Sequence, residues 1–366
     1  MKPYLNDTQE RIPDKRYTQV VCAIAFWVFS FVYLYFYQTE VLSAGQHVLS
    51  GGRTYYQRLI GAFLITLVLY LLQRVLAYFV PLSKRGHALT YFPSLLILTI
   101  ITDFTPDADK TSSWSGWWLA VPVLAIIYGA VLWVIRQIEP YEPETASKGL
   151  MSRTTWVNLL TMSVMFITVG IFSNGDEAFH YRMRMEQLIL HEKVDDALKV
   201  GKRSLATSPS LTMLRAYALS QQGLLGERFF QYPVPEGIEQ LANDSISMQA
   251  ILIPDTLIRI ITETPRSRVD YKLINLLLDK DLNTFASLAT KVYPDSVMPK
   301  HYAEALAYYH YYSGQPKEES SDRVTETDFN DFRKMEKEYH GKELRNQLRR
   351  TFGNTYWYYY KYGGSN

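Results

Sequence analysis

The sequence predicts an all-α protein, in which a five-helix transmembrane bundle is followed by an α-helical domain outside the cytoplasm. Long apolar runs dominate residues 17–173, whereas residues 174–366 are polar, charged and helical in pattern. The mean hydropathy of −0.11 is therefore an average over two unlike halves. We predict an N-terminal segment over 1–19, a transmembrane domain over 20–173 and a helical domain over 174–366.

Composition excludes several classes of protein. The formal net charge is only +2, so no strong field directs the chain to nucleic acid. The single cysteine, Cys22, rules out an intramolecular disulfide, and the helical half is therefore not a disulfide-stapled scaffold. No apolar signal region precedes Cys22, so we expect a small apolar side chain within a membrane helix and not an acylation site.

Five apolar runs are candidates for membrane spans, because a spanning helix needs ~20 mostly apolar residues. The first run, "VVCAIAFWVFSFVYLYFY", is too long and too aromatic for the core of a signal peptide. The third and fifth runs are short, which predicts little tilt or a locally thin bilayer. The predicted spans are residues 20–37, 59–80, 88–104, 117–135 and 156–172.

Lysine and arginine in the short loops predict the orientation of these spans. Nine of them precede the first span or lie between spans two and three or four and five. The opposite loops, 38–57 and 105–116, hold only Arg53 and Lys110. The positive-inside rule therefore puts the N-terminus in the cytoplasm. Since five is an odd number, residues 174–366 are predicted to lie outside the cytoplasm.

Two ionisable residues inside the predicted spans are functional candidates. Arg74 lies six residues before Val80, the last residue of the second span before Pro81, so its Cα is ~9 Å from the cytoplasmic end of that span. We interpret it as a side chain that snorkels or pairs with another helix; a transported or catalytic charge is the alternative. Asp103 is at the outer end of the third span, where water is close.

The helical domain begins with a clear start signal. Asn174-Gly175 breaks the last span, and Asp176 is a good N-cap for the helix that follows. A second helix is predicted from Val194, with an apolar stripe that reaches Leu205, to "SPS" at Pro209, and a third runs from Leu211 to the glycines at 223 and 226. Antiparallel helix pairs of this kind form a repeat unit with a concave face.

The helix pairs resemble the tetratricopeptide (TPR) family. Ala197 and Pro209 are twelve residues apart, as are the late-repeat alanine and the closing proline of that family, and Gly226 stands where the turn between paired helices falls. In "DLNTFASLATKVYP", Ala289 and Pro294, five residues apart, also resemble a second-helix alanine and the closing proline of the family. The resemblance is degenerate, covers about 180–225 and 268–316, and is interrupted over 228–266. It implies a TPR-like domain and not a regular array.

The whole arrangement resembles an uncharacterised family of bacterial polytopic inner-membrane proteins with a TPR-like C-terminal half. The residues that carry the likeness are "SNGDEAFHYRMRMEQL", "YALSQQGLLGERFFQYP", "YAEALAYYHYYSGQP" and "FGNTYWYYYKYG". It implies an inner-membrane location with the C-terminal half in the periplasm. It carries no activity, so no catalytic residue is transferred.

No catalytic, cofactor-binding or metal site is predicted. None of the common nucleotide-binding, hydrolase or zinc motifs occurs. Glu177 and His180 are spaced like half of a di-metal helix motif, and we interpret them as a solvated helix face. Glu40, His47 and Arg53 lie in the outer loop 38–57, where a carboxylate could act as a base on an acceptor hydroxyl.

Two functions remain open. The first, which we favour, is a non-catalytic membrane protein whose helical domain is a scaffold or interaction module for a protein or peptide partner. The second is a membrane enzyme of envelope glycan or lipid metabolism with a site near loop 38–57. Neither reading implies a cofactor or nucleic acid, and both have the lipid bilayer as a partner.

The aromatic tail, "TFGNTYWYYYKYGGSN", is interpreted as part of a helix from Glu343 with a kink at Gly353 and Asn354. Large side chains with a polar tip suit a cap on the helical stack. Contact with lipid headgroups is the alternative.

Overall fold

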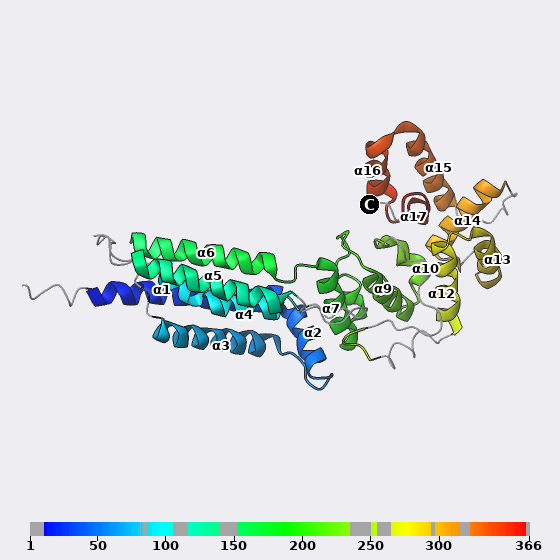
Figure 1. Ribbon diagram of the computed structural model, residues 1–366. Coiled ribbons are helices and arrows are strands. Elements are labelled where there is room, and N and C mark those ends of the chain that lie inside the picture. Colours follow the sequence, from blue (N-terminus) through cyan, green and yellow to red (C-terminus); the bar gives the residue numbers. More distant parts are fainter. Residues whose placement is uncertain are drawn as a thin grey trace, which may run out of the picture. The chain divides into compact units, whose positions relative to one another are not determined.

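The computed structural model describes residues 11–80, 82, 86–104, 116–138, 152–234, 250–254, 265–293, 297–314 and 323–363. These residues form helices joined by turns, and no strand occurs among them, which confirms the all-α prediction. The chain divides into two compact units, Met1–Gly175 and Asp176–Asn366 (Figure 1). Each unit is described by itself.

Among the described residues of the first unit, four helices are long and apolar enough to cross a membrane, as in a multi-pass membrane protein. They cover Arg16–Tyr37, Arg58–Phe79, Trp117–Gln137 and Arg153–Phe172. Cys22 lies in the first of them and is fully buried. The helices of this unit are α1 (Arg11–Val32), continued by the π-helix η1 (Tyr33–Tyr37), α2 (Thr39–Leu49), α3 (Arg58–Phe79), the 3-10 helix η2 (His87–Tyr91), α4 (Phe92–Thr102), α5 (Trp117–Ile138) and α6 (Arg153–Phe172).

The third predicted span is a shorter helix. The apolar helix His87–Thr102, made of η2 and α4, is below the length of ~20 residues that a span usually needs. Hydrogen bonds tie both of its ends to α6 and the residues after it. The Ala88 N–H donates to Asn158 Oδ1 at 2.7 Å, and the Asn174 N–H donates to the Thr102 carbonyl at 3.0 Å. The short helix therefore runs parallel to α6 along most of its length.

Helix α1 runs in the same direction as α6. The hydroxyls of Thr18 and Thr155 are 3.3 Å apart near the start of both helices, and Tyr33 and Ser173 are hydrogen-bonded through their hydroxyls near the other end. Side-chain hydrogen bonds of this kind join helices in an apolar environment.

Helices α3 and α5 run in the opposite direction. Gln73, near the end of α3, donates to Thr90 Oγ1 at the start of the short helix, 2.8 Å away. Trp117, the first residue of α5, donates from Nε1 to Asp103 Oδ2 just after the end of α4, 2.7 Å away. In chain order, α1, α3, α4, α5 and α6 thus alternate in direction (Figure 1).

The second unit is built from consecutive helices that pack against one another. Its main core includes Leu214, Tyr217, Leu273 and Phe285, all almost fully buried. The helices are α7 (Glu177–Leu190), α8 (Val194–Ala197), α9 (Pro209–Gln221), α10 (Leu225–Arg228), the 3-10 helix η5 (Phe229–Gln231), α12 (Pro265–Leu278), α13 (Leu282–Val292), α14 (Lys300–Ser313), α15 (Arg323–Glu338), α16 (Gly341–Phe352) and α17 (Tyr356–Tyr362).

The predicted N-cap of the first helix in this unit is confirmed. Asp176 accepts a hydrogen bond from the Ala178 N–H at 2.9 Å. The next prediction, a helix from Val194 to "SPS" at Pro209, was wrong in length, because α8 ends at Ala197 and turns follow. Gly201 has a φ of 60°, which a continuing helix does not allow, and the ring of Tyr181 packs against it.

Gly226 does not form the turn that the sequence predicted. It lies buried inside α10, where a Cβ would meet the ring of Tyr302 at 2.7 Å. The turn that follows α9 uses Gly223 instead, with a φ of 68°. The absent side chain of Gly226 lets α10 and α14 approach closely.

The aromatic tail forms a separate helix and not the second half of a kinked one. α16 ends at Phe352, and α17 begins at Tyr356. Thr355 has extended backbone between them and caps α17 by accepting from the Tyr358 N–H. The loop residues Gly353 and Asn354 therefore break the helix completely.

Candidate functional site

The polar residues of segment 38–57 do not form a compact site. Most of this predicted loop is helix α2, with Glu40 in its first turn and His47 in its last. Seven residues of helix separate their Cα atoms by ~10 Å along the axis. Arg53 lies exposed beyond the end of the helix.

The other candidate residues named from the sequence are either exposed or accept hydrogen bonds from neighbouring side chains. Arg74 is on the exposed side of α3, and Asp103 accepts the hydrogen bond from Trp117. Glu177 accepts a hydrogen bond from Ser204 Oγ at 3.1 Å. In the described part of the chain, no group of three or more His, Cys, Asp or Glu side chains could hold a metal ion. The positive charges counted at Lys84, Arg85, Lys110 and Lys148, and the closing proline Pro294, lie outside the described residues.

Two buried carboxylates hold distant segments of the second unit together. Glu186 accepts from the backbone N–H groups of Ile251 and Leu252, at 2.9 and 2.6 Å, and pairs with Arg182. These contacts fix residues 250–254, part of the interrupting segment, against α7; residues 235–249 and 255–264 lie outside the described residues. Asp270 accepts hydrogen bonds from the hydroxyls of Tyr293 and Tyr302, and burial raises the pKa of its carboxyl.

A third buried carboxylate, Glu304 on α14, holds the aromatic tail. It accepts from the backbone N–H of Tyr356 at 2.7 Å and lies 2.9 Å from His301 Nδ1. The indole N–H of Trp357 donates to the Glu304 carbonyl at 2.8 Å. Tyr356 and Trp357 are almost fully buried, so the start of α17 is a core element of the unit, as expected of a cap.

Aromatic packing joins the tail to the earlier helices. The ring of Phe230 lies 5.2 Å from that of Tyr356 and 4.9 Å from that of Tyr359, measured between centroids. The hydroxyl of Tyr356 donates to the Leu277 carbonyl at 3.2 Å. Residues near 230 and residues near 359 are therefore neighbours in space.

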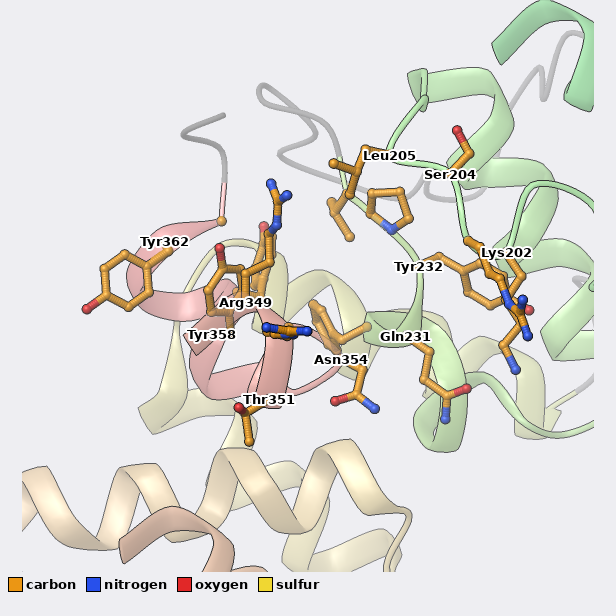
Figure 2. Close-up of a pocket in the computed structure, with 18 residues that line it drawn as sticks. Lys202, Ser204, Leu205, Gln231, Tyr232, Arg349, Thr351, Asn354, Tyr358 and Tyr362 are labelled. Carbon is orange, nitrogen blue, oxygen red and sulfur yellow. The ribbon is translucent and has the colours of Figure 1, made fainter. Parts of the chain in front are cut away.

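A pocket of about 390 Å³ lies at this junction, and it is the candidate functional site. One wall comes from residues 202–205 and 230–234, and the other from the end of α16, the break and α17. Figure 2 shows Lys202 and Ser204 on the first side and Arg349, Tyr358 and Tyr362 on the second. The two walls are far apart in the sequence and meet only because α17 is packed into the core.

The pocket is positively charged. Four cations line it, two from each wall, and its 18 described lining residues include no carboxylate and no histidine. All four lie exposed at the surface. The cations are Lys202, Arg203, Arg349 and Arg350.

Buried aromatic and cationic groups form the floor. Phe230 and Tyr232 line the pocket and are almost fully buried. The guanidinium of Arg215 lies 5.0 Å from the centroid of the Tyr232 ring, and Tyr232 donates its hydroxyl proton to the Leu198 carbonyl at 2.7 Å. Burial lowers the pKa of Arg215 to about 10, so it still carries a positive charge at neutral pH.

The sequence reasoning missed this site. In the sequence, the pocket is marked only by two pairs of consecutive basic residues, Lys202-Arg203 and Arg349-Arg350. The tyrosines of the tail follow the second pair. A basic pair is common on a helical surface, and nothing local indicates that these two pairs meet.

Comparisons with known proteins give one family match. Residues 253–363 match DUF6057, described as a family of unknown function. The match covers α12 to α17, hence the wall that carries Arg349 and Arg350, but not the wall of residues 202–234. No curated protein and no solved structure matches the chain.

Proposed function

We propose that the protein is a non-catalytic, multi-pass membrane protein whose second unit is an interaction module, and that the cationic pocket is its binding site. The pocket is the single observation that carries this proposal. It offers charge and aromatic surface from two walls, and none of its described lining residues is a carboxylate or a histidine that could transfer a proton. The chemistry of such a pocket suits binding better than catalysis.

The uses of the buried acids support the same conclusion. Glu186, Asp270 and Glu304 each accept hydrogen bonds from other segments of the second unit. Buried carboxylates with perturbed surroundings are common at active sites. Here their contacts account for their burial, because each one fixes a helix or a loop in place.

The proposal includes five membrane crossings, with the second unit on the side opposite the N-terminus. The count of five depends on the short helix that contains α4. Its two ends are hydrogen-bonded near the two ends of α6, which is long enough to cross the membrane. Lysines and arginines in the loops favour the same count. With five crossings, nine of them lie on the cytoplasmic side and two on the other side. Without a crossing at α4, seven would lie on the cytoplasmic side and four on the other. We place the protein in a bacterial inner membrane with the second unit in the periplasm.

Photocrosslinking in cells tests the interaction module. A photoreactive amino acid at Asn354, an exposed lining residue of the pocket, should give discrete adducts. The matched control is Asn283, which is exposed on α13 away from the pocket. The adducts at position 354 should disappear when Arg203→Glu and Arg349→Glu reverse the charge of both walls. Adducts that persist in that variant, or that form equally at position 283, would contradict the proposal.

Reporter fusions test the topology. Reporters fused after Gly175 and after Tyr362 should both report a location outside the cytoplasm. Activity of a cytoplasm-only reporter at both positions would show that α4 does not cross the membrane.

A further inference from the structure

We infer that the cationic pocket binds a phosphate group, carried by an anionic lipid headgroup or by a soluble phosphate ester. This inference rests on the proposed interaction module and names the chemistry that the module recognises. It is carried by the juxtaposition of two basic pairs from opposite walls over a floor of buried aromatic rings.

The charges fit a multivalent oxyanion. Arg203 and Arg349 stand on different walls, so a group between them can receive hydrogen bonds from both. Guanidinium groups present planar pairs of N–H donors that match the oxygens of phosphate. A phosphate monoester carries a charge of about −1.5 to −2 at neutral pH, and the phosphate diester of a lipid headgroup carries a single negative charge. The four cations of the pocket can compensate either charge.

Tyr358 supplies a neutral donor beside the cations. Burial raises the pKa of Tyr358, so its phenol keeps its proton at neutral pH and can donate to a phosphate oxygen. The hydroxyl of Tyr362, which also lines the pocket, is engaged elsewhere, because it donates to Glu336 Oε1 at 3.2 Å. Leu205 is about half exposed at the same pocket and provides an apolar contact for a glycerol, sugar or acyl portion.

Arg215 adds a fixed positive charge close to the pocket. It is 1% exposed and does not line the pocket itself, but its guanidinium lies 5.0 Å from the ring centroid of Tyr232, which does. In a buried setting a charge acts over a longer range than in water, so Arg215 adds to the attraction of the pocket for an anion.

The test uses the full chain in phosphatidylcholine nanodiscs and isothermal titration calorimetry. Two probes separate the two sources of phosphate. Inorganic pyrophosphate represents soluble phosphate compounds, and dihexanoyl phosphatidylglycerol below its critical micelle concentration represents a lipid headgroup. The double variant Arg203→Gln, Arg349→Gln removes one cation from each wall. The control double variant Arg184→Gln, Arg268→Gln removes two exposed arginines that do not line the pocket.

We expect saturable binding of at least one probe, weakened at least tenfold in the pocket variant and unchanged in the control. Binding of the lipid alone assigns a lipid headgroup, and binding of pyrophosphate alone assigns a soluble phosphate compound. If neither probe binds, or if both double variants lose the same affinity, the inference is wrong. Thermal melting checks that the pocket variant is folded; if it is not, the single exposed substitution Lys202→Gln replaces it and should weaken binding in the same direction.

The outcome is separable from that of the crosslinking experiment. Charge-dependent adducts at position 354 without binding of either probe would leave the interaction module in place and remove phosphate as its ligand. Adducts that are absent, with neither probe bound, would remove both proposals.

Discussion

Replacement of Glu304 by alanine should release the aromatic tail from the core of the second unit. The carboxylate is 1% exposed and accepts from the Tyr356 N–H at 2.7 Å, with His301 Nδ1 at 2.9 Å. The alanine variant leaves both groups buried without their acceptor. Each unsatisfied buried group costs roughly 1–3 kcal/mol, so the expected loss in the free energy of unfolding is roughly 2–6 kcal/mol.

Thermal melting of the full chain in detergent measures this loss. For a unit of this size, one kcal/mol corresponds to roughly 2–4 °C, so the melting temperature of the second unit should fall by on the order of 10 °C. Glu304→Gln keeps one oxygen acceptor for the Tyr356 N–H and should lose less. The control is Glu338→Ala, which removes an exposed carboxylate of α15 and should melt with the wild type.

Hydrogen exchange locates the effect. Amides of Tyr356–Tyr362 should exchange faster in Glu304→Ala than in the wild type, because the first residue of α17 has lost its anchor. If the variant melts like the wild type and the α17 amides keep their protection, Glu304 does not hold the tail.

Three further predictions concern the second unit. Deletion of residues 351–366 removes Tyr356 and Trp357 from the core. Because each buried aromatic side chain contributes ~1.5–3 kcal/mol, the unit should melt at a markedly lower temperature. If the deletion had an effect only in lipid vesicles, the tail would instead contact the membrane. Gly226→Ala puts a Cβ 2.7 Å from the ring of Tyr302 and should destabilise by ~1–3 kcal/mol, whereas Gly175→Ala, with no atom within 4 Å of the new Cβ, should not. Burial raises the pKa of Asp270 in the folded protein above its unfolded value, so the folded state binds the proton more tightly. The stability of the unit should therefore rise as pH falls from neutral through the folded pKa. Asp270→Asn should remove this contribution, and parallel curves of melting temperature against pH for the two proteins would contradict the prediction.

The helices and their apolar character could be read from the sequence because these features are local. The long apolar runs predicted the four helices that can cross a membrane, and the aspartate after Asn174-Gly175 predicted the cap at Asp176.

The predictions that failed concern glycines, whose structural role the local sequence does not determine. The sequence predicts a turn at Gly226, whereas the structure packs this glycine closely against Tyr302. It also predicts a kink at Gly353 and Asn354, whereas Thr355 caps a new helix after them. A glycine suits a turn, a break or a tight contact equally well, and only the tertiary neighbours decide between them.

The pocket could not be predicted because both of its causes are tertiary. Arg203 and Arg349 face one site only after Phe230 has packed against Tyr356 and Tyr359. Glu304 and His301 also looked like ordinary helix-face residues in "KHYAEALAYY", although both are buried. Charge pairs and acids on a helical pattern are usually solvated, so the sequence offered no reason to select these.

The attachment of α17 through Glu304 joins ligand affinity and the ordering of that helix in one thermodynamic cycle. Only molecules with α17 in place have both walls, so the apparent dissociation constant is the intrinsic one divided by the fraction of such molecules. A ligand at a hundred times its dissociation constant would in turn add ~2.7 kcal/mol to the stability of the ordered form. Substitutions at His301 or Glu304, which do not line the pocket, would thus change affinity by shifting a population, and a bound ligand would restore the lost order.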